Sequence, residues 1–139
     1  MADAAPARML ERANPLTGEV ATRIPADGVA EAKAVVDAAR AAFPAWSAMG
    51  PNARRAMLAK AADELEARAA DFIAAMKGEI GATEGWARFN LGLAASMTRE
   101  AAALTTQVSG QTIPSDKPGC LAMSIREPAG VVLGIAPWN

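Results

Sequence analysis

The stretch GVVLGIAPWN, residues 130–139, decides the fold class that we predict for this chain. Its apolar residues follow one another without alternation, and such runs are typical of strands that helices cover on both faces. Strands of this kind lie in parallel sheets, where a crossover of a dozen or more residues leads to the next strand. The sequence supplies no such neighbour. We therefore expect an α/β protein of which this chain is the opening part.

Length, charge and composition exclude several classes of function. The chain has 139 residues, the size of one domain, and a net charge of −1, so no basic surface attracts nucleic acid or an anionic membrane. It has no histidine and 1 cysteine, which excludes Ser-His, Cys-His and zinc-His chemistry within it, and no metal site is expected. The N-terminus lacks the pattern of a secretory signal, and no stretch is apolar for long enough to span a membrane. A cytoplasmic location is the default expectation.

The first half of the chain predicts a small hairpin followed by alanine-rich helices. Turn signals around residues 14–25 flank a short alternating stretch, which is typical of a β-hairpin or an edge strand. A helix is expected to begin at Asp27, whose carboxylate can cap the first turn, and to stop at Pro44. A longer helical region after residue 50 weakens near Ala69, where two helices can meet, and ends around Gly81. Lys60 with Glu64, and Glu64 with Arg68, have the spacing of ion pairs on its exposed face.

A third helix is expected over residues 83–108. It carries a stripe of large apolar side chains, and such a stripe favours core packing over the wall of a pocket. Gly85 and Gly92 interrupt this helix at a cost in helix stability, which close packing or a nearby ligand would explain. The stripe consists of Trp86, Phe89, Leu93, Met97, Ala101 and Leu104.

Residues 111–127 predict an extended ribbon with one apolar face. Leu121, Met123 and Ile125 alternate with smaller or polar residues, so they share one side. Cys120 stands at the start of this alternation. Activation of a thiol requires a base or an electropositive setting, and no partner of either kind can be named for it. We therefore interpret Cys120 as an incidental thiol.

Three stretches together resemble a known family. They are NPLTGEV from Asn14, the alanine-rich helical region in the middle, and REPAGVVLGIAPWN from Arg126. In order and spacing they resemble the N-terminal portion of the aldehyde dehydrogenase superfamily. The resemblance implies that residues 1–110 form the hairpin and helices of a Rossmann-like cofactor domain. It further implies an oligomerisation β ribbon over 111–127 and the first strand and loop of the dinucleotide-binding sheet over 128–139.

The resemblance also implies a reaction, a cofactor and a set of site residues. The expected reaction is the oxidation of an aldehyde to a carboxylic acid with NAD or NADP, in a homo-oligomer. Asn139 matches the asparagine whose amide donates a hydrogen bond to the oxyanion. The segment that lies against the cofactor in the family corresponds to Ile135, Ala136, Pro137 and Trp138. A helix that borders the substrate tunnel corresponds to Trp86, Phe89 and Leu93, and their character suggests an aromatic or otherwise apolar aldehyde.

Two interpretations remain open at this point. The family's nucleophilic cysteine and general-base glutamate match no position here, so we expect the polypeptide alone to be inactive although the complete enzyme oxidises aldehydes. The alternative is a naturally short, non-enzymatic relic that acts as an oligomerisation module on full-length subunits. The coding sequence beyond codon 139 discriminates between the two.

Overall fold

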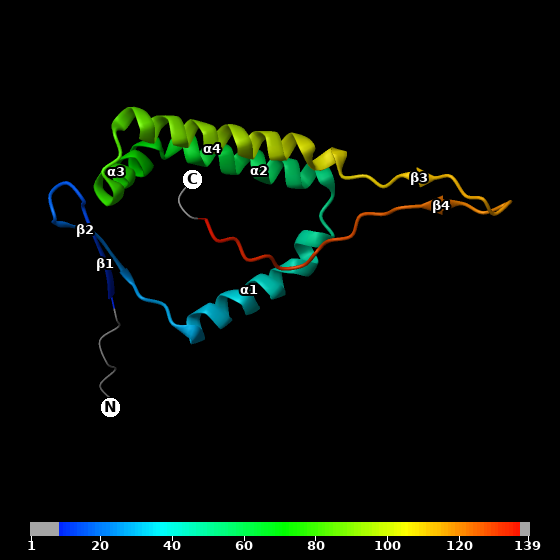
Figure 1. Ribbon diagram of the computed structural model, residues 1–139, viewed down its shortest axis with the longest axis horizontal. Helices are drawn as coiled ribbons and strands as arrows, with labels where there is room; N and C mark the ends of the chain where they lie inside the picture. The colour runs from blue at the N-terminus through cyan, green and yellow to red at the C-terminus, as the bar shows by residue number, and fades with distance from the viewer. Residues whose placement is uncertain (1–8, 137–139) are drawn as a thin grey trace.

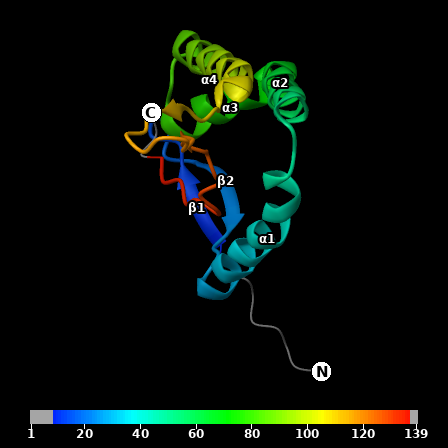
Figure 2. The same ribbon diagram turned by 90° about the vertical axis from the view of Figure 1, so that its right-hand side faces the viewer.

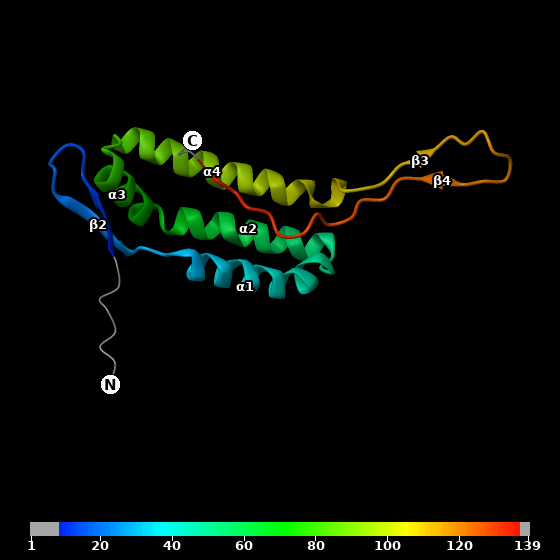
Figure 3. The same ribbon diagram turned by 60° about the horizontal axis from the view of Figure 1, so that its bottom comes forward.

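The computed structural model describes residues 9–136 and has three parts along its length (Figure 1). A β-hairpin lies at one end, the helices fill the middle, and a thin ribbon projects from the other end (Figure 3). The elements in chain order are β1 (Met9–Ala13), β2 (Val20–Pro25), α1 (Val29–Ser47), α2 (Pro51–Ala67), α3 (Ala69–Ile80), α4 (Glu84–Leu104), the 3₁₀ turn η1 (Thr105–Gln107), β3 (Thr112–Ile113) and β4 (Ala122–Met123).

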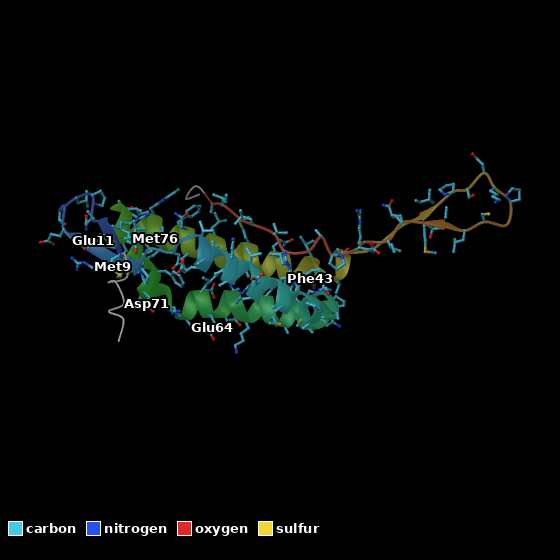
Figure 4. The ribbon with its side chains drawn as sticks, turned by 90° about the horizontal axis from the view of Figure 1, so that it is seen from below. Met9, Glu11, Phe43, Glu64, Asp71 and Met76 are labelled. Atoms are coloured by element: carbon cyan, nitrogen blue, oxygen red, sulfur yellow. The ribbon has the colours of Figure 1, made fainter. Side chains whose placement is uncertain are left out.

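The predicted hairpin is confirmed. Strands β1 and β2 pair antiparallel, and the hairpin packs on α3. The Thr22 hydroxyl donates a 2.7 Å hydrogen bond to the Glu79 carboxylate across this contact. Figure 4 shows Met9 of β1 and Met76 of α3 at the same end of the molecule. The hairpin therefore covers the end of α3 rather than joining a larger sheet among the described residues.

Helix α1 differs from the prediction at both ends. It begins after Gly28, and the Glu31 carboxylate, not that of Asp27, accepts the Gly28 N–H at 2.8 Å. Hydrogen bonds from the backbone N–H groups of Glu31 itself and of Gly28 hold the pKa of Glu31 below its ordinary value. Pro44 does not end the helix, which continues to Ser47. A proline removes one N–H donor, but its carbonyl still accepts, here from Ala48 at 3.1 Å.

The predicted break between the second and third helices is confirmed. Arg68 separates α2 from α3 with φ −101° and ψ 23°, and Gly81 ends α3 in the left-handed conformation with φ 67°. The predicted ion pairs of Glu64 with Lys60 and with Arg68 do not form in the described structure. Arg68 pairs instead with Asp71 at 3.3 Å, which belongs to the next helix.

The core lies mainly between α2 and α4, α3 adds Ile73 to it, and alanine dominates it. Ala62, Ala87 and Ala95 have no exposed surface, and the remaining buried residues are Ile73, Leu91 and Ala102. Small side chains let the two helix backbones approach closely. The prediction that the stripe of Trp86 to Leu104 packs in the core is therefore wrong for its large members, which lie outside this contact and are exposed.

Close packing was one of the two explanations expected for Gly85 and Gly92 of α4, and the structure does not support it. A Cβ built on Gly85 or on Gly92 would meet nothing within 4 Å. Close packing among the described residues is therefore not what these glycines provide.

Helix α1 and residues 128–136 leave most of their apolar side chains exposed. No residue of α1 is buried, and α1 stands apart from α2 and α4 (Figure 2). The predicted first parallel strand is absent from the described part of residues 128–139: residues 128–136 form no strand, and Ile135 is 83% exposed. A strand needs a hydrogen-bonding neighbour, and none is present there among residues 9–136. Val131 and Val132 instead share a shallow groove with Phe43 and Trp46 of α1.

The alanine contact between α2 and α4 generates a test. Replacing Ala95 with leucine inserts a bulky side chain where no exposed surface remains, so we expect the free energy of unfolding to fall by about 1–3 kcal/mol. The matched control is Ala94→Leu, because Ala94 is the exposed neighbour on the same helix, and it should change this value by less than about 0.5 kcal/mol. Urea denaturation followed by circular dichroism measures both variants. Equal effects of the two substitutions would contradict the placement of the core.

Candidate functional site

The exposed face of α4 carries the aromatic residues that the sequence assigned to a substrate channel. Trp86 and Phe89 stack with their ring centroids 5.4 Å apart and an interplanar angle of 29°. They are 41% and 56% exposed, and Leu93, one turn further on, is 46% exposed. The helical repeat places these residues on one side of α4, away from the alanines that face α2. The structure therefore joins all three on one apolar, outward-facing surface.

The first turns of α4 hold this surface in place. The Thr83 hydroxyl caps the helix by accepting the Trp86 N–H at 3.3 Å. The Asn90 amide donates to the Trp86 carbonyl at 3.0 Å. These bonds fix the backbone on both sides of the stacked rings. The ring pair consequently sits on a regular helix and not on a loop.

A small ion-pair cluster borders the aromatic face. The Glu84 carboxylate accepts from Arg88 at 2.7 Å and from Lys77 of α3 at 3.2 Å. The hydrogen bonds from Arg88, and secondly from Lys77, lower the pKa of Glu84 below its ordinary value. A carboxylate in the first turn of a helix also interacts favourably with the helix dipole. Glu84 therefore stays ionised, and it ties the start of α4 to α3.

Further along α4, arginine side chains bridge α4 and α2. Arg99 of α4 donates to Glu66 at 2.7 Å and to Asp63 at 2.8 Å, both on α2. These hydrogen bonds, that to Glu66 first, raise the pKa of Arg99. Arg55 of α2 reaches the other way, to the last carbonyl groups of α4. Sequence analysis missed Arg55 and Arg99, because partners more than 30 positions away leave no local spacing signal.

The remaining predicted site residues lie on the C-terminal segment. Ile135 and Ala136 are exposed and belong to no strand. Pro137, Trp138 and Asn139 lie outside the described residues. The structure thus brings the three α4 residues together on one face of the helix.

Residues 9–136 contain neither a metal-binding cluster nor a membrane-spanning helix. No three side chains of the types Cys, Asp and Glu are grouped there so that they could hold a metal ion. No helix among these residues has the length and hydropathy needed to cross a membrane. Cys120 is exposed, in the turn of the β3–β4 ribbon.

Comparison with known proteins identifies the family. Residues 2–139 match the model of the aldehyde dehydrogenase family. The vanillin dehydrogenase of Pseudomonas fluorescens is 57% identical over 132 residues, which cover 95% of this chain and 27% of that protein. The chain therefore belongs to the aldehyde dehydrogenase family, and it spans little more than a quarter of the length of that relative.

Solved structures have the same arrangement of elements. The salicylaldehyde dehydrogenase of Pseudomonas putida G7, crystallised with salicylaldehyde, superposes with a TM-score of 0.84 at 41% identity over 87% of this chain and 25% of that one. An NAD-dependent benzaldehyde dehydrogenase from Corynebacterium glutamicum gives 0.75 at 28% identity, over 81% of this chain and 24% of that one. The fold of this chain is therefore similar to that of the corresponding part of these two dehydrogenases.

The Glu84 cluster predicts how stability depends on pH. Its pKa is lowered in the folded state, so its contribution is present above the ordinary glutamate pKa of about 4.3 and is lost as the pH falls through the lower folded value. We expect Glu84→Gln to reduce the loss of stability between pH 7 and pH 3. The urea concentration at the midpoint of unfolding, determined at several pH values, measures this loss of stability.

Glu100→Gln is the matched control for this experiment. Glu100 is an exposed glutamate of the same helix, and it makes no ion pair with the described residues. Glu100→Gln should leave the dependence of stability on pH close to that of the unmodified chain. If Glu84→Gln and Glu100→Gln gave the same profile, the Glu84 cluster would not couple stability to pH.

Proposed function

We propose that this chain forms the aldehyde-facing part of an NAD(P)⁺-dependent aldehyde dehydrogenase whose substrates are aromatic aldehydes. The stacked and exposed pair of Trp86 and Phe89 on α4 is the observation that carries the proposal. Large apolar side chains that remain exposed in a group mark a contact surface more often than a neutral one. The named activities of the relatives support the same substrate class, since vanillin, salicylaldehyde and benzaldehyde all carry an aldehyde on a benzene ring.

The chemistry of the α4 face suits a planar ring. An aromatic substrate packs on Phe89 or Trp86 in an offset or edge-to-face arrangement, and such pairs contribute about 0.5–1.5 kcal/mol beyond the burial of area. Leu93 extends the surface by one helical turn and excludes water from the same side. The helix position of the three residues supplies orientation, because the bonds of Trp86 to Thr83 and Asn90 leave its backbone little freedom.

The residues proposed for the cofactor and the oxyanion are those of the C-terminal segment. Ile135 and Ala136 are apolar and exposed, which fits a wall against the planar part of a dinucleotide, although their side chains offer no donor to its pyrophosphate. The nicotinamide of such a cofactor supplies the hydride acceptor when it is bound. Beside Pro137 and Trp138, the amide of Asn139 donates to the oxygen of the reacting aldehyde, by the family resemblance. One donor of this kind contributes about 3–4 kcal/mol to transition-state stabilisation.

The ribbon supports a proposal about assembly. Ile113, Leu121, Met123 and Ile125 are all exposed on the two short strands and their flanks. Open edges together with apolar side chains favour pairing with another chain. We propose a second copy of this protein as the partner, in a homo-oligomer. The same ribbon favours the alternative function, a non-enzymatic association module.

The substrate class is testable in a chimaera that joins residues 1–139 to the remainder of the Pseudomonas fluorescens vanillin dehydrogenase. We expect Phe89→Ala to lower kcat/KM for vanillin by roughly 2- to 10-fold, the equivalent of one aromatic contact, and to leave kcat/KM for propanal nearly unchanged. Steady-state kinetics with both aldehydes measures the difference.

The matched control is Phe72→Ala, which removes an equally large ring from α3, where it lies 5.8 Å from the Arg68 guanidinium. It should alter neither substrate selectively. An aliphatic preference of the chimaera, or an equal loss for both aldehydes in Phe89→Ala, would refute the aromatic substrate class.

A second prediction concerns the 139-residue polypeptide itself. We expect no production of NADH from NAD⁺ and benzaldehyde, because its one cysteine lies exposed in the ribbon and no histidine exists to activate a nucleophile. Absorbance at 340 nm over several hours measures this, with the intact vanillin dehydrogenase as the positive control. Turnover above the buffer rate would contradict the prediction and would point to a nucleophile that we have not identified.

A further inference from the structure

The root of the β3–β4 ribbon is tied by two hydrogen bonds between the same pair of residues. The Ser124 N–H donates to the Gln111 carbonyl at 2.9 Å, and the Gln111 N–H donates to the Ser124 hydroxyl at 3.0 Å. Beyond this pair, the ladder has only the rungs Thr112–Met123 and Ile113–Ala122. A ribbon this short has little stability of its own. Its closure and direction therefore depend on the root.

Gly110 makes this close crossing possible. A Cβ built at residue 110 would lie 2.9 Å from the carbonyl carbon of Ser124 and 3.3 Å from the Cα of Ile125, and it would overlap the Ser124 carbonyl oxygen. These are backbone atoms and cannot rotate away as a flexible side chain could. The φ angle of Gly110 is not positive, so glycine is required at this position for steric reasons and not for its backbone conformation.

Arg55 ties the other side of the root to the helical core. Its guanidinium donates to the carbonyls of Ala102 at 3.3 Å and Ala103 at 3.1 Å, and to the Thr106 hydroxyl at 3.2 Å. The last carbonyl groups of a helix lack partners within the helix, and a positive charge there also complements the helix dipole. Arg55 thus holds the last turn of α4, which ends at Leu104, six residues before Gly110.

We propose that Gly110 and Arg55 are positioning residues that aim the ribbon in one direction relative to the α2–α4 core. The consequence for assembly rests on the proposed function, in which a second copy pairs with the ribbon. A symmetric interface requires both copies to present the same surface in the same orientation. A change of angle at the root displaces the apolar side chains at the far end of the ribbon, and pairing then fails although those side chains are intact.

The single cysteine allows the direction of the ribbon to be measured. Cys120 is exposed near the tip, and Lys60→Cys adds a second labelling point on the exposed side of α2. Spin labels at both positions give a distance distribution by pulsed electron paramagnetic resonance, with excess unlabelled chain to suppress signals between molecules. We expect one narrow distribution without further substitution, and a broad or displaced distribution in Gly110→Ala. The control is Gly85→Ala, because a Cβ at Gly85 meets nothing within 4 Å.

Arg55→Ala provides a second variant that does not depend on the crowded crossing. It removes the three bonds to the end of α4, and it should broaden the distribution with far-ultraviolet circular dichroism unchanged. Arg55→Lys should restore it only in part, because an ammonium group lacks the planar fork. A narrow distribution at the original distance in Gly110→Ala or in Arg55→Ala would overturn the role of that residue.

Sedimentation velocity on the same variants separates the two proposals. A self-associating parent chain together with monomeric Gly110→Ala and Arg55→Ala supports the link from ribbon direction to assembly. Variants that associate as the parent does would overturn that link. A parent chain that stays monomeric would refute ribbon-mediated self-association by this polypeptide, and the label distances would still decide whether the root aims the ribbon.

Discussion

The close contact between α2 and α4 is the interaction on which the other features of the structure depend. Ala62 of α2 and Ala95 of α4 have no exposed surface left, and Ala87 at the start of α4 has none either. Among the large apolar side chains of α4, Leu91 is buried, whereas those of Trp86, Phe89, Leu93, Met97 and Leu104 are exposed. The candidate substrate surface at Trp86 and Phe89 thus lies outside this core.

Polar groups determine how this helix pair is aligned and where it ends. Arg99 reaches Glu66 and Arg55 reaches the last turn of α4, so each bridges the two helices from the opposite side. Individual exposed ion pairs contribute little to stability. Their value here is geometric, since together with the Glu84 cluster they hold both ends of α4. The positions of the aromatic face and of the ribbon therefore depend on the two ends of α4.

Local signals in the sequence were sufficient to predict several of the turns and helix ends of the fold. The hairpin turn, the break at Arg68, the end of α3 at Gly81 and the ribbon were all predicted, because each depends on neighbouring residues. Pro44 was misjudged, since one lost donor does not stop a helix whose following carbonyl groups are still used. The large residues of α4 were assigned to the core by hydrophobicity alone. A pattern of this kind identifies a face but does not state which face is buried.

The sequence by itself determined the family, through the order and spacing of its N-terminal, central and C-terminal stretches, together with the helices and turns that short-range chemistry specifies. Only the tertiary structure decided that alanine builds the core, that Trp86 and Phe89 face outward as a stacked pair, and that residues 128–136 form no strand. The same holds for the contacts of Arg55 and for the crossing at Gly110. The physical reason is that each of these depends on groups far apart in the chain, whose meeting no local pattern encodes.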